Sequence, residues 1–177
     1  MTNALQHIRG FCFGYPLFCG YEVLSRQPDQ LHLRIDGVRT TFLAYPFRFR
    51  YPALEFQRVR VADPRDIAVM KAQAIGRRAT ARDYVDLALL LDMRVTSINE
   101  IITAAKEIFV AEGEAEFSER LFLQQLVYTE DIQDAAEAVA LVRIPDWTFE
   151  RAKRVLEKEV QNYLQKTMDP ETRGFKL

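Results

Sequence analysis

The sequence predicts an α+β fold, in which a small antiparallel or mixed sheet is followed by a bundle of helices. Alternating apolar and polar residues mark the first third of the chain, whereas apolar residues at helical spacing dominate the remainder. Strands that precede helices, rather than alternate with them, are typical of α+β proteins. A chain of 177 residues, 49% of them hydrophobic and 28% charged, is long enough to bury a core.

The strand-rich part is expected to cover residues 1–62. Residues 31–35 and 38–43 both alternate between apolar and polar side chains, and an Asp-Gly pair at Asp36 separates them. Such a pair between alternating runs predicts a two-residue hairpin, because a type I′ turn needs positive φ at both central positions. Residues 54–62 alternate again and are expected to form another strand.

Two helices in residues 63–95 are expected to complete this core. The first should begin at Asp63, which suits the N-cap, with Pro64 at the first helical position and Asp66 at the third. A run of apolar residues at helical spacing is expected to form its buried stripe: Ile67, Met70, Ala74 and Ile75.

The second of these helices is expected to begin at Thr80. Asp83 follows three residues later, which resembles a capping box with Asp in place of Glu. Residues 85–91 are apolar nearly all round the helix, so this helix should lie at the centre of the protein.

A C-terminal helical region is expected over residues 96–168. It should contain a helix that ends near Gly113, one or two further helices, and a long amphipathic helix that begins near Phe149. Residues 169–177 are expected to form a frayed tail.

One block of the sequence carries a family pattern. The pattern is D-I-x-x-M-K-x-x-A-I-x-x-R followed by R-D-x-x-D-L, and its residues here are Asp66, Ile67, Met70, Lys71, Ala74, Ile75, Arg78, Arg82, Asp83, Asp86 and Leu87. On these residues the chain resembles the AbiEii/AbiGii-type nucleotidyltransferases, which are toxins of abortive-infection and toxin–antitoxin systems. The resemblance covers roughly residues 21–165. It implies a polymerase-β-like core with a helical region, and transfer of a nucleotidyl group from a nucleoside triphosphate to an RNA or protein acceptor.

One motif that the resemblance implies is missing. Family members hold two divalent metals with a Gly-Ser or Gly-Gly turn followed by Asp-x-Asp. None of the seven glycines here is followed by Gly or Ser, and no Asp-x-Asp occurs. We therefore expect a truncated member that is inactive or incomplete as this chain alone, with no metal ligands. Mg²⁺ and a nucleoside triphosphate are implied for complete members only.

The same resemblance selects the candidate site residues. Lys71 and Asp83 are the candidate catalytic residues, and Arg78, Arg82 and Asp86 are candidates for binding nucleotide or phosphate. A lysine offers phosphate a compact positive charge, and arginine can bind phosphate bidentately. Structural alternatives stay open. Lys71 can be a surface lysine at the edge of an apolar stripe, Asp83 a helix cap, and Asp86 an ion-pair partner of Arg82 or Arg78.

Charge and cysteine usage bear on location and partners. Residues 1–82 hold 13 Lys and Arg against 6 Asp and Glu, which can indicate a basic face for RNA or attraction between the two halves of one fold. The two cysteines, without a signal peptide or an apolar stretch long enough for a membrane span, favour the cytoplasm. The alternative function is a non-catalytic binding module: the partner of an antitoxin, half of a split nucleotidyltransferase, or a homo-oligomer.

Overall fold

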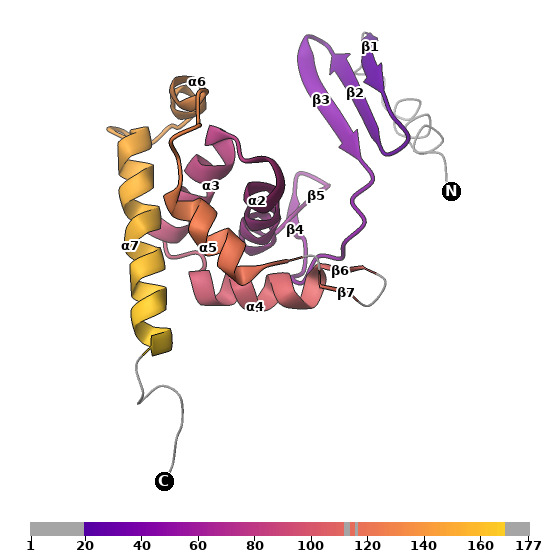
Figure 1. The fold of residues 1–177 in the computed structure, drawn as a ribbon. Coiled ribbons are helices and arrows are strands. Elements are labelled where there is room, and N and C mark those ends of the chain that lie inside the picture. The colour runs from indigo at the N-terminus through magenta and orange to yellow at the C-terminus, as the bar shows by residue number, and fades with distance from the viewer. Residues whose placement is uncertain (1–19, 112–113, 116, 169–177) are drawn as a thin grey trace. The chain divides into compact units, whose positions relative to one another are not determined.

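The computed structural model describes residues 20–111, 114–115 and 117–168 (Figure 1). The chain divides into two compact units, Met1–Arg48 and Phe49–Leu177. Antiparallel strands come first and helices follow, which confirms the predicted α+β class. The expected frayed tail, residues 169–177, lies outside the described residues.

The first unit contains a three-stranded antiparallel sheet in the order β1-β2-β3. Its strands are β1 (Tyr21–Arg26), β2 (Gln30–Ile35) and β3 (Val38–Leu43). Asp36 and Gly37 have φ of 47° and 84°, so the predicted two-residue hairpin with positive φ at both turn positions is confirmed. Leu31 and Leu33 of the central strand are buried.

The second unit begins with a hairpin, whereas the sequence predicts a single strand there. Residues 54–62 form β4 (Leu54–Phe56) and β5 (Val59–Val61), which pair antiparallel. The prediction is wrong because Gln57 and Arg58 take φ of 47° and 68° and reverse the chain. Neither residue is a usual turn former at positive φ, so alternation alone could not show the turn.

Six helices and a short hairpin make up the rest of the described second unit (Figure 1). The helices are α2 (Pro64–Arg78), α3 (Ala81–Asp92), α4 (Ile98–Ile108), α5 (Glu119–Val127), α6 (Ala135–Ala140) and α7 (Phe149–Met168). The hairpin consists of β6 (Val110–Ala111) and β7 (Glu114–Ala115). The predicted helix end near Gly113 is wrong, because the backbone leaves the helix at Phe109 and enters β6.

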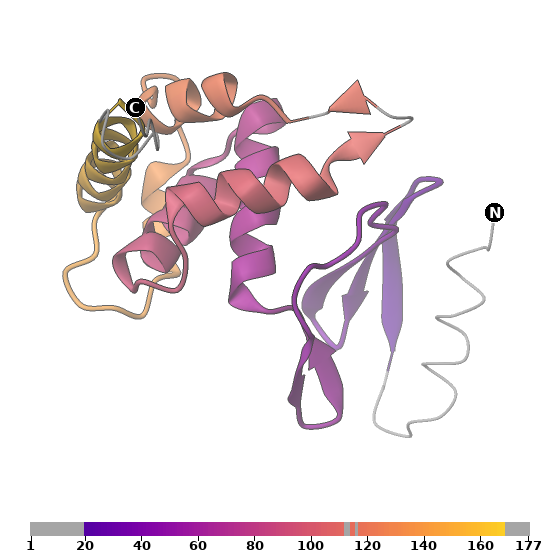
Figure 2. The same cartoon turned by 90° about the horizontal axis from the view of Figure 1, so that it is seen from below.

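Helix α2 begins as the sequence predicts but buries a different face. The Asp63 side chain accepts a hydrogen bond from the N–H of Arg65, and Pro64 lies in the first turn. Neighbouring helices α3, α4 and α5 all pack against α2 (Figures 1 and 2). They cover the side of α2 that carries Ala68, Val69, Ala72 and Ile75. Of the four residues predicted to be buried, Ile75 is buried, whereas Ile67, Met70 and Ala74 are only half-buried.

Helix α3 is central, as predicted from its apolar sequence. It packs against α2, α6 and α7, and Val85, Leu87 and Leu91 are almost fully buried. The Tyr84 hydroxyl donates to the carbonyl oxygens of Gln125 and Tyr128, at 3.0 and 3.3 Å. Burial raises the pKa of Tyr84 to about 12, with smaller contributions from nearby carboxylates, so this phenol keeps the proton that it donates.

No helix in the described part of the chain is both long enough and apolar enough to cross a membrane.

Candidate functional site

Lys71 joins α2 to α3 through two carboxylates. Its Nζ lies 2.9 Å from Asp83 Oδ1 and 2.7 Å from Asp86 Oδ2. The two acids are three residues apart on α3, so both can face the same neighbouring helix. The Lys71 side chain is 24% exposed and that of Asp83 is 13% exposed, whereas Asp86 is 47% exposed. The structure therefore brings together three of the five candidate site residues.

Asp83 has two structural roles at once. Its Oδ1 accepts from Lys71, while its Oδ2 accepts from the N–H and the hydroxyl of Thr80, at 3.3 and 2.9 Å. The second set of contacts belongs to the predicted capping box at the start of α3. The helix cap thus holds the carboxylate in the orientation that receives the ammonium group.

The Lys71 ammonium remains charged at neutral pH. Burial lowers its pKa, but hydrogen bonds from Lys71 to Asp86 and Asp83 outweigh burial, so the net shift is upward from 10.5. A lysine with a raised pKa is a poor proton acceptor, which excludes Lys71 as a general base at neutral pH. An ammonium has three N–H donors, and its two carboxylate partners can use two of them.

The arginine candidates lie at the ends of the same two helices. Arg82 is exposed and has no ion-pair partner in the part of the chain that the structure describes, so Asp86 pairs with Lys71 rather than with Arg82. Arg78 is the last residue of α2, and its side chain is outside the described part.

The donor set does not fit a magnesium site. A cation at Asp83 and Asp86 would compete with the Lys71 ammonium, which already occupies one oxygen of each carboxylate, and with Thr80, which holds the second oxygen of Asp83. Magnesium prefers several oxygen ligands in octahedral geometry. Among the described residues, no group of three or more His, Cys, Asp or Glu side chains is placed to hold a metal ion.

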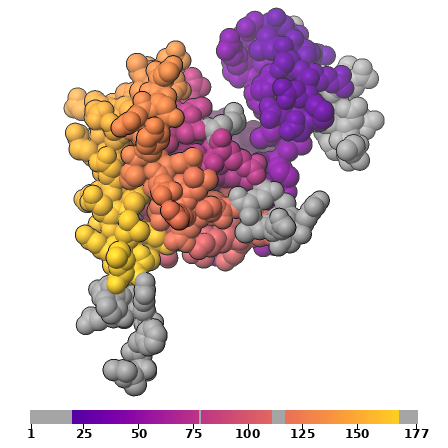
Figure 3. Space-filling view, in the orientation of Figure 1, coloured from indigo at the N-terminus to yellow at the C-terminus, as the bar shows by residue number. Residues whose placement is uncertain are grey.

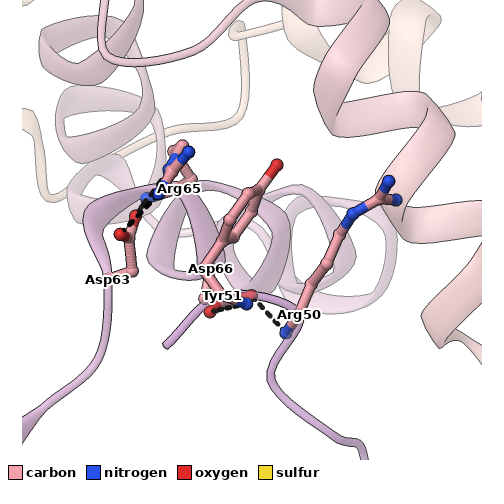
Figure 4. A network of polar contacts seen from close by, with 5 residues as sticks. All are labelled: Arg50, Tyr51, Asp63, Arg65 and Asp66. Carbon is pink, nitrogen blue, oxygen red and sulfur yellow. Dashed lines mark hydrogen bonds and ion pairs between the residues drawn. The ribbon is translucent and has the colours of Figure 1, made fainter. Parts of the chain in front are cut away.

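Sequence reasoning missed a second polar network, at the start of α2 (Figure 4). Asp66 is 2% exposed, and its two carboxylate oxygens accept from the backbone N–H groups of Arg50 and Tyr51, at 2.9 and 3.1 Å. The Arg65 guanidinium lies 3.8 Å from the centre of the Tyr51 ring and pairs with Asp63. The network ties the segment before β4 to the first turn of α2.

A pocket of about 240 Å³ adjoins this network. Its lining includes Phe49, Tyr51, Arg60 and both acids at the start of α2. Both acids are engaged, since Asp63 binds Arg65 and Asp66 binds backbone N–H groups. The pocket therefore offers a ligand mostly apolar surface and one guanidinium.

Comparison with known proteins assigns the family. A family model described as "Nucleotidyl transferase AbiEii toxin, Type IV TA system" matches residues 13–166. The chain belongs to the AbiEii family. This confirms the resemblance inferred from the sequence, and Lys71, Asp83 and Asp86 all lie inside the matched range.

A curated relative extends the comparison. The AbiEii-family chain is 30% identical over 148 residues to an uncharacterized protein of Aquifex aeolicus (strain VF5), a match that covers 80% of this chain and 65% of the relative. The chain thus spans a little less than two thirds of the length of that relative. No solved structure matches the chain.

Proposed function

We propose that this chain takes part in nucleotidyl transfer from a nucleoside triphosphate to an RNA or protein acceptor. Lys71 and Asp83 are its proposed catalytic residues. Arg78, Arg82 and Asp86 are proposed to bind the nucleotide, the two arginines at its phosphates. The observation that carries the proposal is the position of the Lys71 ammonium, which bridges Asp83 and Asp86 of the family block. The pKa of Lys71 is raised, so this cation persists at neutral pH. A fixed cation in a partly buried site stabilises the negative charge of a phosphoryl group.

The chemistry follows from the donors on Lys71. Its third N–H can donate to a non-bridging phosphate oxygen while Asp83 and Asp86 hold the other two. Asp83 acts by orienting the ammonium, because its second oxygen is held by Thr80. Asp86 is the more exposed acid, so it is better placed to accept a hydrogen bond from an incoming hydroxyl group.

We also propose that residues 1–177 do not complete the reaction alone. The sequence contains no Gly-Ser or Gly-Gly turn and no Asp-x-Asp, and the acids beside Lys71 are already paired with an ammonium. Two divalent metals supply charge neutralisation in complete family members, and a lysine with arginines does not replace them.

We further propose that the protein acts in the cytoplasm, where nucleoside triphosphates are available.

Nucleotide binding tests the proposed site. Replacing Lys71 by Met is expected to weaken binding of a fluorescent nucleoside triphosphate analogue about tenfold, because a hydrogen bond to a charged group contributes about 1.5–3 kcal/mol. Lys106→Met is the matched control. Lys106 also bridges two helices, through Glu119, and its loss changes the net charge equally. Equal weakening by both substitutions would contradict the site.

Transfer activity tests the second part of the proposal. The pure chain, given α-labelled nucleoside triphosphates, magnesium and a total RNA pool, is expected to leave the RNA unlabelled. Robust labelling that a Lys71→Ala variant loses would overturn the proposed inactivity and strengthen the assignment of Lys71.

The second candidate function is a binding module, and the β4–β5 hairpin favours it. The pairing register places Leu54, Phe56, Val59 and Val61 on one face, where they are 50, 64, 56 and 40% exposed. Exposed apolar surface is typical of protein interaction sites. A toxin–antitoxin family supports an antitoxin as the partner, and a second copy of the chain is the other choice.

Light scattering after size exclusion separates these choices. On the homo-oligomer version, the pure chain elutes as a dimer or larger, and Phe56→Ser returns it to a monomer. Leu164→Ser, which alters an apolar side chain of 42% exposure on α7, should leave the mass unchanged. A strict monomer at all concentrations would count against self-association.

A further inference from the structure

A basic pocket lies where the end of α3 meets α7, apart from the Lys71 cluster. It has a volume of about 180 Å³ and is lined by four cations, Arg94, Arg151, Arg154 and Lys158, and by two acids, Asp92 and Glu159. The formal charge of the lining is therefore +2. Helix α7 exposes one side along the surface of the helical unit (Figure 3, yellow).

Two of the cations are held in place by the two acids. Arg151 pairs with Asp92 at 3.1 Å, and Arg94 pairs with Glu159 at 3.2 Å. The Arg151 guanidinium also lies 4.6 Å from the centre of the Trp147 ring, which adds a cation–π contact. These interactions engage both acids of the lining and offset the charge of two of its four cations.

The other two cations have no acidic partner among the residues that the structure describes. Arg154 and Lys158 are both exposed and lie four residues apart on α7, so they occupy the same face with Cβ atoms about 5–6 Å apart. Two neighbouring free cations on one helix face can contact successive phosphates of an extended strand.

The lining argues against a protein partner. Val155 is its one apolar side chain and the other six lining residues are charged, whereas charged residues are depleted in the buried core of a protein interface. Affinity for a nucleic acid backbone needs no such core, because it comes from neutralising phosphates and releasing counterions. Arginine in addition matches the geometry of phosphate oxygens.

We propose that this pocket binds the phosphate backbone of a single RNA strand. The inference rests on the proposed function only in naming that RNA as the acceptor, since binding here is independent of Lys71. Arg154 and Lys158 contact the phosphates directly, and Arg94 and Arg151 line the path of the strand.

Fluorescence anisotropy with a labelled single-stranded RNA tests the proposal. We expect the double substitution Arg154→Gln and Lys158→Gln to weaken binding about tenfold and to flatten the plot of log affinity against log salt by about 1.4, which is about 0.7 for each phosphate that is no longer neutralised. Both side chains are exposed, so the thermal unfolding midpoint should not change.

A matched control removes the same charge from the same helix. The control is the double substitution Lys153→Gln and Lys166→Gln. Both lysines lie on α7 outside the pocket, and Lys153 pairs with Glu150, so the change in RNA affinity should be less than twofold. Equal weakening by both pairs would overturn the site, as would unchanged binding in the Arg154 and Lys158 variant. If polyglutamate displaced the labelled RNA as effectively as unlabelled RNA does, the pocket would not prefer RNA to an acidic protein, and the choice of RNA would be wrong.

A third variant separates this inference from the proposed function. Lys71→Met should leave RNA affinity unchanged while it weakens nucleotide binding about tenfold. If RNA binding depended on Lys71 and not on the basic pocket, the pocket inference would be wrong and the Lys71 site would be where RNA binds.

Discussion

Replacing Asp66 by alanine is expected to lower the free energy of unfolding by about 3 kcal/mol, the largest effect we expect from a single substitution. Asp66 is 2% exposed, and each of its oxygens accepts a backbone N–H group. Truncation would leave the N–H groups of Arg50 and Tyr51 without an acceptor. An unpaired donor costs about 1–3 kcal/mol when it is fully buried, and the two hydrogen bonds lost here are partly buried.

Urea unfolding followed by circular dichroism would measure this loss. Asp66→Asn keeps one acceptor oxygen and should cost about half as much. Asp131→Ala is the control, because Asp131 is exposed, and its loss should change stability by less than about 0.5 kcal/mol. A loss at Asp66 no larger than at Asp131 would mean that the two hydrogen bonds add nothing to stability.

Replacing Lys71 by methionine is expected to cost about 2 kcal/mol at pH 7. The substitution keeps most of the side-chain volume but leaves Asp83 and Asp86 without their shared cation. Breaking a fully buried pair costs about 3–5 kcal/mol, and exposed pairs contribute about 0–1 kcal/mol. Lys71 is 24% exposed and lies between these limits. Lys106→Met, at a pair whose lysine is 54% exposed, should cost less than about 1 kcal/mol.

The cost at Lys71 should depend on pH. Its pKa is higher in the folded protein than in the unfolded chain, so the folded state holds the proton more tightly. The stabilisation is therefore complete below the unfolded pKa of about 10.4 and is lost as the pH rises through the folded value. Unfolding at about pH 8 and about pH 11.5 should show the difference between wild type and Lys71→Met shrinking with pH. A constant difference would contradict the ion-pair account.

Local features of the fold could be predicted, because a few neighbouring residues determine them. The hairpin at Asp36 and the helix starts at Asp63 and Thr80 depend on interactions within about three residues. The turn at Gln57 and Arg58 has no such local signal. The buried face of α2 also has no local signal, because the packing of α3, α4 and α5 determines which side of α2 is covered.

The candidate site was only partly open to prediction. Helical spacing places Asp83 and Asp86 on one face, but it says nothing of Lys71, twelve residues before Asp83. That interaction requires α2 and α3 to fold back on one another. The family resemblance selected Lys71, Asp83 and Asp86 as candidate site residues, but it did not predict that they form ion pairs. The hydrogen bonds that Asp66 accepts from the N–H groups of Tyr51 and Arg50 span 15 and 16 residues and match no motif, so they could not be predicted.

The shared carboxylate of Asp83 has one more consequence. The same side chain receives Lys71 and completes the cap at Thr80, so the two interactions are linked through a single group. A ligand that draws the lysine away leaves this acid wholly to Thr80. The rate at which amide protons in the first turn of α3 exchange with solvent would then differ between the free protein and the protein with a ligand on Lys71.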